Sequence, residues 1–203
     1  MGALGIGPGV RVVAYDDASG GVAARMWYVL RAHGHEDVAV LDGGFAKWLA
    51  EGRPVSSETP LITAAAFEAR LRPGFLVNKD ELVASHRTRL VLDARAPERY
   101  RGETEPIDPR AGHIPGARSA PWTRNLTSES VPVFLPPVIL RGHYESLGAA
   151  RERPVVYCGS GVNACHDILA LQVAGLDGSL YAGSWSEWSS DPALPAATGD
   201  QPG

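Results

Sequence analysis

Short apolar runs alternate with longer segments of helix-forming residues over most of the chain. Several of these runs end in Asp or Gly, which is typical of a buried strand that enters a turn. The predicted strands span residues 10–15, 38–41, 89–93 and 154–157, with a closing segment at 178–181. The predicted helices span residues 22–33, 45–50, 79–86, 142–147 and 163–174. This alternation predicts an α/β fold, a parallel sheet flanked by helices.

Three stretches lack such a pattern. Residues 53–60 are polar with Pro and Ser, and we interpret them as an interdomain linker. Residues 95–137 are rich in Pro and Gly and are expected to be irregular. The Pro- and Ala-rich tail after Ser190 is expected to be loosely held.

An internal repeat predicts two tandem copies of one α/β unit. The aligned pairs are 13–16 with 155–158, Gly34 with Gly175, and 43–48 with 183–188. The second copy has a long segment before its central strand, whereas the first has almost nothing before Arg11. We therefore predict an incomplete, N-terminally truncated domain at residues 1–59 and a complete catalytic domain at residues 60–203.

Composition narrows the classes of function. The chain of 203 residues has 19 Lys and Arg against 23 Asp and Glu, and this net charge of −4 argues against nucleic acid or an anionic membrane as the main partner. No apolar run reaches the roughly 20 residues of a membrane span, and no signal peptide is evident at the start. Two cysteines are too few for a disulfide framework or a thiolate zinc site, so we expect a cytoplasmic protein without a metal.

The turn at residues 158–163 carries the candidate chemistry. It lies between an apolar strand and a helix, where successive backbone N–H groups and the helix N-terminus form a cradle for an anion. Cys158 at its mouth is expected to have a lowered pKa, and Gly159 and Gly161 let the backbone curl. These features suit a covalent sulfur carrier, although a buried structural cysteine is the simpler alternative. A cysteine phosphatase would need an arginine six residues after the cysteine, where this chain has Ala164.

The loop at residues 158–165 closely resembles the active-site loop of 3-mercaptopyruvate sulfurtransferases, members of the tandem rhodanese family. Residues 93–100, 111–117 and 181–188 are similar to that family as well. The resemblance implies two rhodanese domains, of which the first is inactive and the second catalytic. Asp16 stands at the position of the cysteine in the first copy, as expected of an inactive domain.

The resemblance also implies roles for single residues. Cys158 matches the nucleophile that forms a persulfide, and Ser160 matches a serine used in proton handling. Arg99 matches an arginine that clamps the substrate carboxylate, with an ion pair to Glu98 or Glu103 as the alternative. Further predicted substrate-binding residues are Arg110, as a second clamp, and the loop residues Gly159, Gly161, Val162 and Asn163.

The resemblance bears on the donor as well. The neutral Gly159 and Ser160 favour 3-mercaptopyruvate over thiosulfate, whose users carry basic residues there. Asn163 replaces a commoner threonine, and the His and Asp of the family's proton relay fall in the missing part of the first domain. Persulfide formation is therefore predicted more firmly than fast turnover.

Other polar and aromatic residues have simpler explanations. We expect His113 to be a structural turn residue with its ring bonded to the backbone, and Cys165 to be a small core residue. His166 is predicted to lie on a solvated helix face, and Trp185 and Trp188 are predicted to be packing anchors.

The resulting hypothesis is a sulfurtransferase without a cofactor. It moves sulfane sulfur from 3-mercaptopyruvate or thiosulfate to cyanide or a thiol acceptor, with thioredoxin among the candidates, through a persulfide on Cys158. The alternatives are a persulfide carrier or regulatory rhodanese module that another enzyme charges, and an inactive fragment of a longer enzyme.

Overall fold

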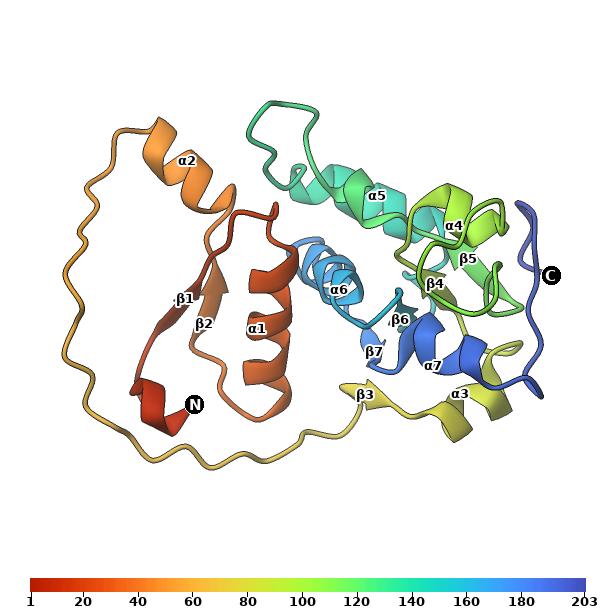
Figure 1. Cartoon of the computed structure of the whole chain (residues 1–203), viewed down its shortest axis with the longest axis horizontal. Helices are drawn as coiled ribbons and strands as arrows, with labels where there is room; N and C mark the ends of the chain where they lie inside the picture. Colours follow the sequence, from red (N-terminus) through yellow and green to blue (C-terminus); the bar gives the residue numbers. More distant parts are fainter.

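The computed structural model describes residues 1–203 and contains two separate parallel sheets. The smaller sheet pairs β1 (Val12–Ala14) with β2 (Val38–Val40), with Val12 opposite Val38. Helix α1 (Gly21–Ala32) connects these two strands, and α2 (Gly44–Ala50) follows them (Figure 1). A short 3-10 helix, η1 (Gly2–Leu4), precedes β1.

The larger sheet has five strands in the order β3-β7-β6-β4-β5, and every neighbouring pair is parallel. The strands are β3 (Leu76–Val77), β4 (Val91–Asp93), β5 (Ala117–Ser119), β6 (Val155–Tyr157) and β7 (Ser179–Tyr181). The helices are α3 (Lys79–Ser85), α4 (Pro97–Arg101), the 3-10 helix η2 (Trp122–Asn125), α5 (Pro137–Ser146), α6 (Asn163–Val173) and α7 (Ser184–Ser190). The predicted α/β fold, a parallel sheet flanked by helices, is confirmed.

Each face of the larger sheet has its own apolar core. One core joins Leu92 and Val156 of the sheet to α6, α5 and the buried face of α1. The other joins Val155 and Tyr157 to α3 and α7. All three residues of β4 and of β6 are buried because helices cover both faces, which explains why these strands read as continuous apolar runs.

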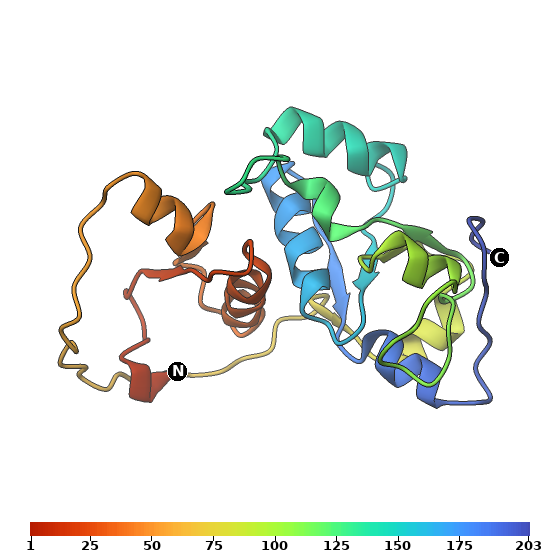
Figure 2. The same ribbon diagram turned by 45° about the horizontal axis from the view of Figure 1, so that its top comes forward.

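Helix α6 lies between the larger sheet and α1 (Figure 2). Trp27 and Tyr28 of α1 belong to the same apolar core as Cys165 and Ile168 of α6. The core therefore crosses the proposed boundary between residues 1–59 and 60–203, and the division into two domains stays a prediction.

Three expectations about irregular segments need correction. Residues 95–137 contain α4, β5 and η2, although we expected no regular structure there. The stretch without helix or strand between α2 and β3 covers residues 51–75, longer than the predicted linker, and it runs around the outside of the smaller sheet (Figure 1).

Third, the C-terminal tail is not loosely held, because hydrogen bonds tie it to the larger unit, which is built around the five-stranded sheet. His113 and Ala197 exchange backbone hydrogen bonds of 2.8 and 2.9 Å. The indole N–H of Trp188 donates to the carbonyl of Pro195 at 2.7 Å. No helix of the structure is long and apolar enough to cross a bilayer.

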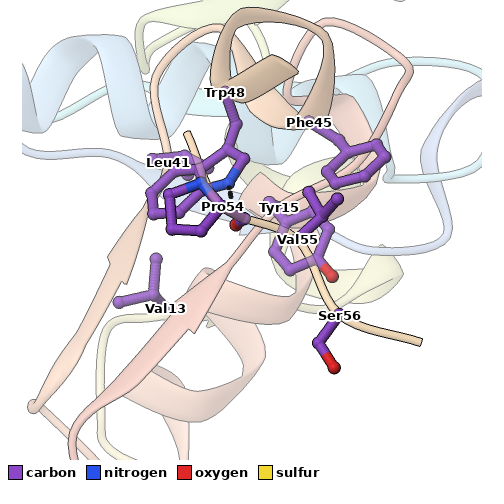
Figure 3. Close-up of a pocket in the computed structure, with 8 residues that line it drawn as sticks. All are labelled: Val13, Tyr15, Leu41, Phe45, Trp48, Pro54, Val55 and Ser56. Carbon is purple, nitrogen blue, oxygen red and sulfur yellow. Dashed lines mark hydrogen bonds between the residues drawn. The ribbon is translucent and has the colours of Figure 1, made fainter. Parts of the chain in front are cut away.

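The smaller sheet leaves one face partly uncovered. Val13 and Tyr15 keep 58% and 60% of their surface exposed. They border a mainly apolar cavity of about 490 Å³, which is shown in Figure 3. The lining residues are Val13, Tyr15, Leu41, Phe45, Trp48, Pro54, Val55 and Ser56.

Candidate active site

Cys158 directly follows β6, at the carboxyl edge of the larger sheet where α/β proteins bind their ligands. Its side chain is only 3% exposed, and the backbone N–H of Gly161 points at its sulfur with an N–Sγ distance of 3.1 Å. Gly161 has φ +75°, and a Cβ on it would lie 2.7 Å from the carbonyl oxygen of Ala182. Only glycine fits there, so the curl that turns an N–H toward the sulfur depends on Gly161.

The start of α7 holds the cysteine loop in place. The Ser184 hydroxyl accepts the backbone N–H of Cys158 at 3.1 Å and donates to the carbonyl of Tyr181 at 3.0 Å. The backbone N–H and the hydroxyl of Ser186 both donate to the carbonyl of Gly159, at 3.0 and 2.7 Å. Sequence reasoning missed these serines, although both lie in the 183–188 segment that it aligned with residues 43–48.

A cavity of about 340 Å³ opens at the cysteine. It brings together six of the predicted site residues, namely Cys158, Gly159, Ser160, Val162, Asn163 and Arg99. Gly161 belongs to the same loop but is buried and does not line the cavity. The other lining residues were not predicted and are Arg95, Ala96, Ile107, Asp108, Trp122 and Ser186.

Arg99 reaches the cavity from α4, and its side chain is 17% exposed. Its Nε and Nη2 atoms donate to the carboxylate of Glu105 at 3.3 and 2.6 Å, and Nη2 also donates to Asp108 at 3.1 Å. The alternative pairing with Glu98 or Glu103 is not observed. Burial acts to raise the pKa of Glu105, but the hydrogen bonds from Arg99 and from two backbone N–H groups outweigh it and lower that pKa.

Arg95 supports this part of the wall from within. Its side chain is 2% exposed and pairs with the fully buried Asp93 at 2.7 Å and with Glu105 at 3.2 Å. It also donates to the carbonyl of Gly112 at 2.6 Å. Such a satisfied buried ion pair orders the wall of a site, and removing one partner is costly.

The structure does not bring Arg110 to the cavity. Its guanidinium donates to four backbone carbonyls in α7 and the segment that follows, at 2.8 to 3.2 Å. These carbonyls belong to Trp188, Ser189, Asp191 and Leu194. Since its donors are engaged there, the prediction of Arg110 as a second substrate clamp is wrong, and its observed role is to fix the chain after α7.

The structure also tests the residues with simpler explanations. The His113 ring is bonded to the carbonyl of Tyr100 at 2.8 Å and stacks on the Tyr100 ring, which confirms its structural role. Trp185 and Trp188 are fully buried, as expected of packing anchors. Cys165 is buried, and burial raises its pKa to about 12, which confirms a core residue.

His166 is fully buried, so its predicted solvated face is wrong. Its ring stacks on Phe134, meets Trp122 edge-on, and contacts the side-chain amide of Asn125 at 3.2 Å. The same amide donates to the buried Asp167 at 2.7 Å. Burial lowers the pKa of His166 to about 4, so the ring is neutral at physiological pH.

The smaller unit, built around the two-stranded sheet, contributes one hydrogen bond to the loop. The Arg25 guanidinium of α1 donates to the carbonyl of Ser160 at 3.2 Å. Sequence reasoning missed this residue because nothing in the local pattern of an amphipathic helix marks an arginine for a distant loop.

Fold and site together define a class of protein, the parallel α/β proteins that hold a cysteine in a backbone cradle at the end of a central strand. The model of the rhodanese-like domain matches residues 3–51 and 78–191. The chain therefore belongs to the rhodanese family.

Known relatives agree with this assignment. The chain is 45% identical to a Pseudomonas aeruginosa protein named "probable 3-mercaptopyruvate sulfurtransferase", over 98% of this chain and 71% of the relative. It is 37% identical to the thiosulfate sulfurtransferase of Bos taurus, over 93% and 66% of the two chains.

A solved structure that is 26% identical, with a TM-score of 0.82, covers 98% of this chain. It is described as an enzyme variant with a cysteine persulfide, in a tetrahedral intermediate state with ergothioneine. The chain spans about two thirds of the length of the two curated relatives and 53% of this solved chain.

Proposed function

We propose that this chain is a sulfurtransferase that carries sulfane sulfur as a persulfide on Cys158. The observation that supports it best is that one cavity contains both the Cys158 sulfur and the Arg99 guanidinium, and that the sulfur is buried and accepts a hydrogen bond from the Gly161 N–H. The N–H stabilises negative charge on the sulfur. The similar enzyme with a persulfide on its cysteine supports the same chemistry.

The sulfur atom is transferred in two steps. The Cys158 thiolate attacks the sulfur of 3-mercaptopyruvate, so that an S–S bond forms and the donor's C–S bond breaks. The carbon that loses sulfur keeps the electron pair as an enolate and takes up a proton to become pyruvate. An acceptor thiolate or cyanide then attacks the outer sulfur, and the Cys158 thiolate leaves. Ser160 lines the cavity and is the proposed group for proton handling.

The donor proposed here is 3-mercaptopyruvate, with thiosulfate as the second candidate because both names occur among the relatives. Gly159 and Ser160 bring no positive charge to the loop, which suits a monocarboxylate better than a dianion. Arg99 would bind its carboxylate, and Val162 and Asn163 would contact the rest of the donor from the cavity wall. Cyanide, small thiols and thioredoxin are the proposed acceptors.

Intact-mass spectrometry tests the proposal directly. Wild type treated with 3-mercaptopyruvate should gain the mass of one sulfur atom and lose it when cyanide is added. The Cys158→Ser variant, treated in the same way, should gain no sulfur. A matched series with thiosulfate identifies the preferred donor. If folded wild type gains no sulfur from either donor, the chain is not an autonomous sulfurtransferase, and a carrier charged by another enzyme becomes the better explanation.

A further inference from the structure

Arg95, Arg99 and Asp108 are the charged residues that line the cavity, and together with Asp93 and Glu105 behind them they form a cluster with more negative than positive charge. Arg95 and Arg99 supply two positive charges, and both pair with carboxylates of Asp93, Glu105 and Asp108. Glu105 and Asp108 are only 4% and 5% exposed at their side chains. An anion that enters this cavity therefore meets an arginine whose charge is already balanced.

The two acidic partners of Arg99 differ in how firmly they are held. The Glu105 carboxylate accepts five hydrogen bonds, from Arg95, from two nitrogens of Arg99, and from the backbone N–H groups of Ile107 and Asp108. The Asp108 side chain accepts one, from Nη2 of Arg99 at 3.1 Å. Glu105 is thus a fixed anchor, whereas Asp108 can turn away at the cost of a single hydrogen bond.

The two acids also use different edges of the guanidinium. Glu105 takes the edge formed by Nε and Nη2, so the other proton of Nη2, which serves Asp108, points toward the Nη1 side. Nη1 makes no hydrogen bond and lies 3.5 Å from where a Cβ on Gly159 would stand, so it faces the cysteine loop. A carboxylate that binds Arg99 bidentately next to Cys158 needs an N–H of Nη1 together with the N–H of Nη2 that donates to Asp108.

We propose that Asp108 is a specificity-determining residue, which competes with the donor for the free edge of Arg99 and selects singly charged over doubly charged donors. This inference rests on the proposed function of the same cavity. When a monocarboxylate binds, its carboxylate takes the place of the Asp108 carboxylate on Arg99, and the Asp108 side chain turns aside. A dianion is repelled twice as strongly by Asp108, which stays within the cavity wall.

Asp108→Asn tests the inference, because the amide keeps the shape of the side chain and removes its charge. We expect pyruvate to bind the variant about threefold more tightly, and sulfate, as a dianion, about tenfold or more, when both are titrated by calorimetry. In turnover, KM for thiosulfate should fall more than KM for 3-mercaptopyruvate, with little change in kcat. Glu105→Gln, which loosens the anchor, should instead weaken both anions alike.

Glu98→Gln is the matched charge control. Glu98 is on α4, next to Arg99, but it is exposed and outside the cavity, so its substitution changes the net charge by the same amount and should leave the sulfate-to-pyruvate ratio unchanged. If Asp108→Asn shifts that ratio by less than twofold, or weakens both anions, Asp108 only positions Arg99 and the inference is wrong. Since the binding arm needs no turnover, a chain that forms no persulfide would refute the proposed function while the role of Asp108 is still decided.

Discussion

The smaller and larger units share a strand–loop–helix arrangement, but the two loops hold different side chains. After β6, the loop presents the N–H of Gly161 to the Cys158 sulfur at 3.1 Å. After β1, the loop holds the carboxylate of Asp16, which accepts N–H groups of Ala18, Gly20 and Ala23 at 2.9, 2.8 and 2.7 Å. In both units backbone N–H groups of the turn before the helix point at the side chain that follows the strand. The difference is that the side chain in the smaller unit is a carboxylate, whereas in the larger unit it is the cysteine that we propose as the sulfur carrier.

The units differ as well in what covers the sheet. Trp188 in α7 is fully buried against the larger sheet, because α3 and the segment before β5 pack on the same face. The smaller sheet has no such neighbours, so Tyr15 stays 60% exposed and Trp48 borders the apolar cavity in Figure 3. The stability of similar elements therefore depends on the segments that cover them.

The largest effect is expected when Cys158 is replaced by aspartate, the residue type at the matching position of the smaller unit. In Cys158→Asp, a carboxylate takes the place of the sulfur and can accept the Gly161 N–H, as Asp16 does in its own loop. We expect a folded protein whose sulfur transfer from 3-mercaptopyruvate falls by at least about 10³-fold, because the nucleophile is gone. Turnover and thermal unfolding measure the two outcomes. Cys158→Ser is the control, and activity above one part in a hundred in the aspartate variant would contradict the assignment of the nucleophile.

A matched pair of tryptophan substitutions tests the role of the covering segments. Trp188→Ala should lower the free energy of unfolding by about 3 to 5 kcal/mol, since it removes a fully buried indole and its bond to Pro195. Trp48→Ala should cost less than about 2 kcal/mol, because that side chain is only half-buried beside an open cavity. Urea unfolding of both variants gives the comparison. Equal costs would mean that the smaller unit is packed as firmly as the larger one.

Local pattern was enough to predict most of the strands and long helices. Strand β6 was predicted at 154–157 and observed at Val155–Tyr157, because a strand buried on both faces is apolar throughout. Helix α4 and strand β5 were missed because they have five and three residues within a Gly- and Pro-rich stretch. These two elements are stabilised by tertiary contacts, such as the hydrogen bond that the Tyr100 hydroxyl donates to the carbonyl of Ala117.

The site was predictable where it is local and not where it is assembled from distant segments. The loop at residues 158–163 carries its own signal, but Ser184 and Asp108 reach it from other elements. The wrong predictions have the same origin. Arg110 was taken for a substrate clamp, and His166 for a solvated residue, because their partners lie 78 and more residues away in the first case and across two packed elements in the second.

Removing the built-in anion of the smaller unit should have a moderate effect. Asp16→Ala loses three hydrogen bonds, two from the turn before α1 and one from its first turn, and should lower the free energy of unfolding by about 1 to 2 kcal/mol. Burial acts to raise the pKa of Asp16, but the backbone hydrogen bonds lower it overall. The stabilisation is therefore present above pH 4 and lost as the pH falls through the lowered pKa. Asp17→Ala, at an exposed neighbour without such bonds, is the control, and equal costs for the two variants would show that the cradle contributes nothing.

The smallest expected effect concerns His166, which lies where the two units meet, next to Gly20. Burial lowers its pKa to about 4, against the opposing influence of the Ser19 backbone and the charge of Asp16. Between pH 6.5 and 4 the unfolded chain binds a proton that the folded protein does not, so stability falls as the pH falls through this window. The loss should be about 1 kcal/mol at pH 5.5 relative to pH 7.5.

Urea unfolding of wild type and His166→Phe over this range isolates the contribution. The buried Asp167, whose pKa is raised by burial, titrates in both proteins and cancels to first order in the difference. We expect the variant to have a shallower dependence on pH, because a phenyl ring keeps the stacking with Phe134 but binds no proton. An unchanged slope would mean that the folded protein binds the proton as readily as the unfolded chain, and that the contact between the two units tolerates a charge at this position.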